Sequence, residues 1–120
     1  WNRPWLGVGP GQFVGEMGSL WKNYPAYLFQ PVHNIYLLIA DELGFLGLAA
    51  FMLWLVFLIV EYYRKTKFQK LYHASFFIVF LSVLVMGLFD HFLWTLQQGQ
   101  LMFGLVLGLI AASDKLEKVV

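Results

Sequence analysis

Three long apolar stretches, separated by short polar segments, occupy the last two thirds of the chain. The first has eighteen uncharged residues from Leu43 to Val60, the second runs from about Leu71 to Phe89, and the third extends from Leu93 to Ala112. A helix needs about 20 apolar residues to cross a hydrocarbon core about 30 Å thick. The pattern therefore predicts an all-α membrane protein with three transmembrane helices. The third is the least regular, because three glutamines lie between Leu93 and Gln100.

The segment that precedes the first span has a different pattern. Aromatic residues and glycines are frequent, and four prolines interrupt any long helix: Pro4, Pro10, Pro25 and Pro31. Aromatic side chains of this kind collect at the level of the lipid headgroups. We expect residues 1–32 to form an irregular external loop that contains a short amphipathic helix from about Gly11 to Trp21.

Basic residues set the expected orientation. The connection between the first and second spans has four: Arg64, Lys65, Lys67 and Lys70. Only Arg3 and Lys22 precede the first span, and cytoplasmic loops retain the larger share of Lys and Arg. The basic connection is therefore expected inside, with residues 1–32 outside, residues 33–112 in the membrane and residues 113–120 as a cytoplasmic tail.

This orientation brings the polar groups at the ends of the spans to one external face. They are His33, Asp41, Glu42, Asp90 and His91. Ionisable groups next to the hydrocarbon core are costly, and they usually have a function. The candidate site is therefore expected at this face.

Composition supports a membrane protein and excludes several functions. Hydrophobic residues make up 60% of the chain and charged residues only 12%, a balance that a soluble domain of 120 residues would not tolerate. A net charge of +1 gives no reason to expect a nucleic-acid partner, and the absence of cysteine excludes disulfides and thiolate metal sites. The three histidines have no i,i+4 pair, so no metal site is expected. Because the chain begins at Trp1 with residues typical of the middle of a loop, we expect a C-terminal piece of a longer chain.

The pair His33-Asn34 is the first candidate for chemistry. Pro31 favours the first turn of a helix here, where backbone N–H groups are unpaired and the helix dipole is positive. His33 is either an interfacial histidine bonded to loop backbone or an acid–base group, and Asn34 is either a helix cap or a substrate contact. In a continuous helix Glu42 lies opposite His33, so its partner is expected on another helix or loop.

Two further segments have distinctive patterns. The glycines of residues 7–11 allow sharp bends, but no Lys-Ser/Thr pair follows them, so a structural turn that docks Phe13 is favoured over a phosphate cradle. Asp90 and His91 either mark a junction between two helices or form a second side of the candidate site at the external face.

Four segments together form a recognisable pattern. They are the glycine turn of residues 7–13, the His-Asn pair in residues 31–37, the Glu-Leu-Gly stretch in residues 41–48, and residues 90–99. This pattern resembles the O-antigen ligase and polymerase family of bacterial membrane glycosyltransferases. The resemblance extends over about residues 5 to 112.

The resemblance implies a reaction and a set of site residues. A glycan would be transferred from undecaprenyl diphosphate to a hydroxyl of a lipid or glycan acceptor, at the outer face of the bacterial cytoplasmic membrane, without a metal or other cofactor. His33 would activate or orient the acceptor hydroxyl, because imidazole exchanges protons near neutral pH. Substrate contacts are expected from Asn34, Glu42, Asp90, His91 and Arg3.

The leaving diphosphate requires cationic groups. Members of the family place arginines for this purpose upstream of the glycine turn, so preceding transmembrane helices are expected partners, together with membrane lipids. Within this chain, Arg3 and Lys22 are the remaining candidates for contact with the diphosphate. The chain alone is expected to be inactive.

Two other classes of protein have to be weighed against an enzyme. In a transporter or flippase, the polar residues would line a substrate or proton path. In a structural subunit, the aromatic loop would form an interface. Polar clusters confined to one membrane face favour the enzyme, because transport sites lie near the bilayer midplane.

Overall fold

The computed structural model describes residues 3–25, 28–66 and 71–116, with side chains as far as Ala112. Within these ranges the chain is helical and has no strand. The helices are α1 (Phe13–Leu20), α2 (Ile35–Thr66), α3 (Leu71–Met86), α4 (Phe92–Thr95) and α5 (Gln97–Leu116). The all-α prediction is confirmed.

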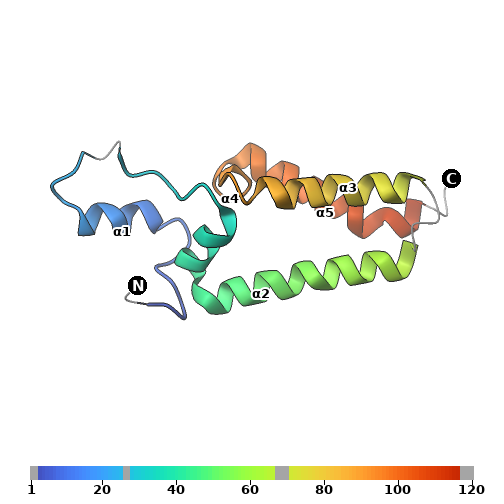
Figure 1. The fold of residues 1–120 in the computed structure, drawn as a ribbon, viewed down its shortest axis with the longest axis horizontal. Helices are drawn as coiled ribbons and strands as arrows, with labels where there is room; N and C mark the ends of the chain where they lie inside the picture. Colours follow the sequence, from blue (N-terminus) through green and yellow to red (C-terminus); the bar gives the residue numbers. More distant parts are fainter. Residues whose placement is uncertain (1–2, 26–27, 67–70, 117–120) are drawn as a thin grey trace.

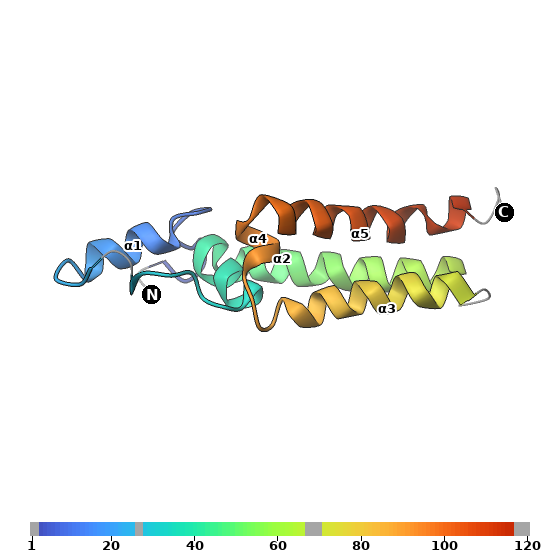
Figure 2. The same ribbon diagram turned by 90° about the horizontal axis from the view of Figure 1, so that it is seen from above.

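The three longest helices lie side by side along an elongated molecule that measures 60 × 26 × 18 Å (Figure 1). α5 packs against both α3 and α2, and the three helices run together over most of their length (Figure 2). The chain passes along α2, returns along α3 and turns through α4 into α5. The start of α2, the end of α3 and the start of α5 therefore meet at one end of the bundle, the end at which α1 and its loop also lie.

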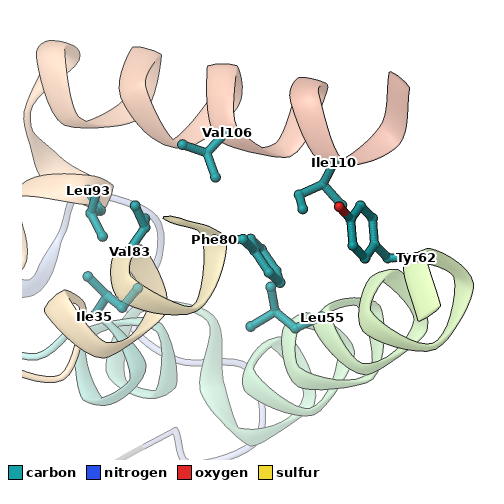
Figure 3. Close-up of a cluster of buried hydrophobic side chains, with 8 residues drawn as sticks. All are labelled: Ile35, Leu55, Tyr62, Phe80, Val83, Leu93, Val106 and Ile110. Carbon is teal, nitrogen blue, oxygen red and sulfur yellow. The ribbon is translucent and has the colours of Figure 1, made fainter. Parts of the chain in front are cut away.

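Large apolar side chains fill the space between the helices (Figure 3). Phe80 of α3 is fully buried near Leu55 of α2, and burial of such a side chain contributes about 1.5–3 kcal/mol. The outward faces are also apolar, since Leu53 of α2 is 70% exposed and Leu71 of α3 is 85% exposed. A surface of this kind is suited to lipid or to further helices around the bundle.

Among the described helices, only α2 is long and apolar enough to cross a membrane. Its part from Phe45 to Thr66 is about 33 Å long at 1.5 Å per residue, close to the thickness of the hydrocarbon core. α3 has 16 residues, and the apolar part of α5, Gln97–Ala112, is similarly short. The structure thus indicates membrane association through α2, and helix length does not confirm three transmembrane helices.

A break at Gly44 divides α2, where the sequence predicts a continuous helix from about Val32 to Val60. Gly44 has φ 72° and ψ −177°, a conformation that is essentially restricted to glycine. The helix begins at Ile35 and changes direction at Gly44 (Figure 1). The continuous helix assumed for the positions of His33 and Glu42 is therefore wrong. Carbonyls before the break and amides after it also need new partners.

The glycine-rich loop supplies partners for the first half of α2. The amide of Val8 donates to the carbonyl of Asp41 at 3.0 Å, and the amide of Gly9 donates to the carbonyl of Glu42 at 2.9 Å. These two bonds satisfy carbonyls that the helix leaves unpaired at the break.

The same loop accepts hydrogen bonds from the second half of α2. The amide of Phe45 donates to the carbonyl of Pro4 at 2.9 Å, and the amide of Leu46 donates to the carbonyl of Trp5 at 3.4 Å. Residues on both sides of the break are therefore bonded to one short loop, which fixes the angle between the two halves.

Gly7 and Gly44 permit the close approach of this loop. A Cβ on Gly7, at φ 69°, would lie 2.3 Å from the carbonyl oxygen of Glu42, and a Cβ on Gly44 would lie 2.3 Å from the carbonyl of Trp5. The glycine turn is structural, as the sequence predicts. Its docking partner is the break in α2, which the sequence does not predict.

The remaining local predictions have mixed outcomes. α1, at Phe13–Leu20, confirms the short helix expected from Gly11 to Trp21. In the third apolar stretch, Leu96 is extended, with φ −100° and ψ 136°, and it separates α4 from α5. A single helix that begins near Leu93 is therefore wrong.

The described part of the basic connection lies at the opposite end of the bundle from the break. Arg64 and Lys65 are exposed there and pair with Glu61 at 3.1 and 3.7 Å. Lys67, Lys70 and residues 117–120 of the predicted tail lie outside the described residues. The two ends of the bundle thus differ in charge, and the polar residues of interest lie at the end without these basic side chains.

Candidate functional site

Asn34 holds the start of α2 in place. Its Oδ1 accepts hydrogen bonds from the amides of Tyr36 and Leu37 at 2.9 and 3.0 Å, as a helix cap does. Its Nδ2 donates to the carbonyl of Leu88, just beyond α3, at 3.1 Å. The cap interpretation of Asn34 is confirmed, and both ends of its amide group are used to join α2 to α3.

Asp90 and His91 form the junction between α3 and α4. Asp90 Oδ1 accepts from the amides of His91 and Phe92 at 2.6 and 3.1 Å. Nδ1 of His91 lies 2.7 Å from Oγ1 of Thr95, and the same hydroxyl donates to the carbonyl of His91 at 3.2 Å. The junction interpretation is confirmed. Among the described residues, the second carboxylate oxygen of Asp90 and Nε2 of His91 make no hydrogen bond.

His33 lies beside this junction. Its ring centroid is 5.1 Å from that of His91, and His33, Asp90 and His91 each offer one metal-ligand atom within 4.8 Å of the others. His33 is exposed, the other two are half-buried, and the His33 ring has no hydrogen bond to any described residue. The sequence argument against a metal site considered spacing within one helix, whereas these donors come from two segments. If the site holds a metal, these three residues supply its ligands.

Glu42 is a buried carboxylate, with only 3% of its surface exposed. Its Oε2 accepts a hydrogen bond from Nε1 of Trp94 in α4 at 3.0 Å, so its partner lies on another helix, as expected. Nε2 of Gln100 in turn donates to the carbonyl of Trp94 at 2.6 Å. α2, α4 and α5 are joined through these polar contacts at the His33 end of the bundle.

A cavity of about 430 Å³ lies beside Glu42 and Trp94. Phe13 and Pro31 contribute apolar parts of its wall, and Thr95 contributes a hydroxyl. Thr95 also contacts His91, whereas His33, Asp90 and His91 themselves do not line the cavity. The cavity is open to one side, and its size and its few polar groups make it a candidate site for a small ligand.

Arg3 lies on a different cavity, of about 420 Å³, together with Asp41 and Glu16. Neither His33 nor His91 lines it. Lys22 is exposed beyond the end of α1 and lines neither of the two cavities. The structure therefore brings together three of the expected site residues, namely His33, Asp90 and His91. Glu42 is connected to them through Thr95, which lines the cavity beside Glu42, whereas Arg3 lines the other cavity, and Phe13 lines both.

Two contacts were not anticipated from the sequence. Thr95 was not a candidate, although its i,i+4 spacing from His91 is a signal that would have found it. The pairing of Trp94 with Glu42 has no such signal, because 52 positions separate the two residues. Trp94 and Gln98 do not share one helix face, because the chain breaks between α4 and α5.

Comparisons of the chain with protein-family models, with curated proteins and with solved structures each find no match. A function for the chain therefore has to be argued from its own residues and their geometry.

Proposed function

We propose that this chain is part of a membrane glycosyltransferase similar to the O-antigen ligases and polymerases. It transfers a glycan from undecaprenyl diphosphate to a hydroxyl of a lipid or glycan acceptor, at the outer face of the bacterial cytoplasmic membrane. The observation that carries the proposal is the position of His33 against Asp90 and His91, a cluster that Thr95 connects to the cavity lined by Glu42 and Trp94.

His33 is the group that takes the proton from the acceptor hydroxyl. The acceptor oxygen bonds to the anomeric carbon of the glycan as the bond to the diphosphate breaks, and the diphosphate leaves with the electron pair. The exposure of His33 supports this role, because its ring has no hydrogen bond to a described residue. A positioned general base typically contributes about 100- to 10,000-fold to a rate.

The cavity beside Glu42 and Trp94 is the proposed glycan site. Sugar hydroxyls donate well to a carboxylate, and the apolar face of a sugar packs well against an indole ring. Glu42 and Trp94 are held together by their hydrogen bond at 3.0 Å, which pre-orients both groups. Thr95 links this cavity to His91, and Asp90 positions His91 through its backbone amide.

The proposal places α2, α3 and α5 across the membrane together, with the His33 end outside. The apolar outward faces of the helices support this arrangement, as do the basic residues Arg64 and Lys65 at the other end. α3 itself is about 24 Å long at 1.5 Å per residue, and the turn from Gly87 to Phe89 extends its apolar segment.

The diphosphate needs cations that the histidine cluster does not contain. Arg3 lies on a separate cavity, so it is a peripheral contact at most in this arrangement. By the family resemblance, arginines of preceding transmembrane helices supply the charge that stabilises the leaving group. Those helices and the surrounding lipid are the proposed partners of this chain.

The test is glycan transfer in membranes of a bacterial host without its own ligase, with the protein expressed in its natural full-length form and given a labelled lipid-linked donor. At equal abundance in the membrane, we expect His33→Ala to lower the transfer rate about 100-fold or more, because it removes the base. Gln30→Ala, an exposed polar position in the same loop, is the matched control and should transfer at the wild-type rate.

Transfer by His33→Ala at the wild-type rate would refute the role of His33. Absence of transfer by the wild type would favour the transporter or flippase, in which the glycan crosses the membrane and stays attached to its diphosphate carrier.

A further inference from the structure

The cluster of His33, Asp90 and His91 has the donor set of a transition-metal site. Two imidazole nitrogens and one carboxylate oxygen lie within 4.8 Å of one another. This combination suits Zn²⁺ and its first-row neighbours, whereas Mg²⁺ and Ca²⁺ prefer oxygen ligands. Three protein ligands leave the fourth tetrahedral position open, as in zinc sites that bind water or substrate.

The hydrogen bonds of the junction leave the ligand atoms available. A threonine hydroxyl has one proton, and that of Thr95 is donated to the carbonyl of His91. With this direction of the Thr95 hydroxyl, Nδ1 of His91 donates to Oγ1 of Thr95 in the tautomer that keeps a lone pair on Nε2. Metal-binding histidines have this arrangement, with the second nitrogen held by an oxygen acceptor. Asp90 uses Oδ1 for two backbone amides and retains Oδ2 for a metal.

His33 is the ligand that has to move. With bonds of about 2.0–2.1 Å, ligand atoms around tetrahedral Zn²⁺ lie about 3.3 Å apart, so the cluster has to close by about 1.5 Å. The exposed His33 side chain is the one free to rotate for this closure, whereas the backbone next to it is held. The amide of Ile35 donates to the carbonyl of Gly87 at 2.8 Å, and Asn34 donates to the carbonyl of Leu88.

We propose that His33, Asp90 and His91 bind one divalent ion of the Zn²⁺ class, with water in the fourth position. This inference goes beyond the proposed transfer reaction and does not depend on it. The two are linked in one respect: a metal on the His33 nitrogen occupies the lone pair that a general base needs. The bound ion is therefore an inhibitor of transfer.

Co²⁺ is the probe for this site, because its four-coordinate complexes absorb visible light. The protein in its natural full-length form, in nanodiscs of zwitterionic lipid, is titrated with Co²⁺ at neutral pH and then with Zn²⁺ or Mg²⁺ as competitor. We expect one bound Co²⁺ that Zn²⁺ displaces and Mg²⁺ does not. His33→Ala and His91→Ala each remove a ligand and should lower the Co²⁺ affinity by more than about 100-fold. Thr95→Val removes only the hydroxyl that holds the His91 ring, and it should lower the affinity by about 10- to 100-fold.

Glu61→Gln is the matched control, because it removes a carboxylate at the opposite end of the bundle, and it should retain the wild-type affinity. Circular dichroism checks that each variant keeps its helical content. Equal Co²⁺ affinity in the wild type and in the double variant His33→Ala/His91→Ala would overturn the site, and so would the absence of Co²⁺ binding by the wild type. The titration contains no glycan donor, so its result is independent of whether transfer occurs.

Discussion

Replacement of Gly7 by alanine tests the contact between the loop and the break in α2. Gly7 has φ 69°, and a Cβ there would lie 2.3 Å from the carbonyl oxygen of Glu42. Gly11 has nearly the same φ, 70°, but a Cβ at that position would have no atom within 4 Å. The variants Gly7→Ala and Gly11→Ala therefore separate backbone strain from loss of the contact.

The expected magnitudes follow from these contacts. Both variants place alanine in left-handed backbone, which costs about 1–2 kcal/mol. Gly7→Ala also pushes the loop away from Glu42 and weakens the hydrogen bonds of Val8 and Gly9, each of which contributes about 0.5–1.5 kcal/mol. We therefore expect Gly7→Ala to destabilise the docked loop by about 1–3 kcal/mol more than Gly11→Ala does.

Hydrogen exchange at the amides of Val8 and Gly9, with the protein in nanodiscs, measures this difference. Exchange through local opening should be about 5- to 150-fold faster in Gly7→Ala than in Gly11→Ala, since each 1.36 kcal/mol corresponds to a factor of ten. Equal exchange in the two variants would refute the reasoning, because strain alone would then explain both effects.

Two further predictions concern the polar contacts that hold the site. Asn34→Ala should lower the free energy of unfolding by about 1–2 kcal/mol, because it removes the helix cap. Asn34→Asp keeps the accepting oxygen and should lower it less. Equal thermal unfolding temperatures of the two variants would contradict the cap. Trp94→Phe should cost about 1–3 kcal/mol, because it leaves the buried Glu42 carboxylate without its donor. The double variant Trp94→Phe/Glu42→Gln should recover part of that loss, as measured by unfolding in denaturant. An unchanged stability of Trp94→Phe would exclude the hydrogen bond.

Local sequence signals predicted the local features of the fold. Four prolines and the aromatic residues of the loop predicted an irregular segment with one short helix, and α1 is that helix. Pro31 and the Asn34 side chain predicted a helix start close to that of α2, because capping depends only on neighbouring amides. Apolar length predicted the three long helices, although their exact ends depend on turns that hydropathy does not encode.

The features that the sequence did not predict depend on contacts between distant segments. Gly44 is one of two glycines in α2, and only the docking of Pro4 and Trp5 distinguishes it as the position of the break. The proximity of His33 and His91 likewise depends on the antiparallel return of α3 to the start of α2. The ends of the predicted spans therefore placed the site residues at one end of the bundle, but periodicity within one helix did not give their partners.

The central claim is that two distant segments of the chain form one site, and the most direct test is the separation of residues 33 and 91. The chain contains no cysteine, so spin labels can be attached at His33→Cys and His91→Cys. The structure predicts strong dipolar broadening of the spectrum for this pair. The control pair His33→Cys and Arg64→Cys, about 40 Å apart along α2, should show none. A spectrum for residues 33 and 91 equal to the sum of the two single labels would contradict the site, and with it both the transfer and the metal proposals.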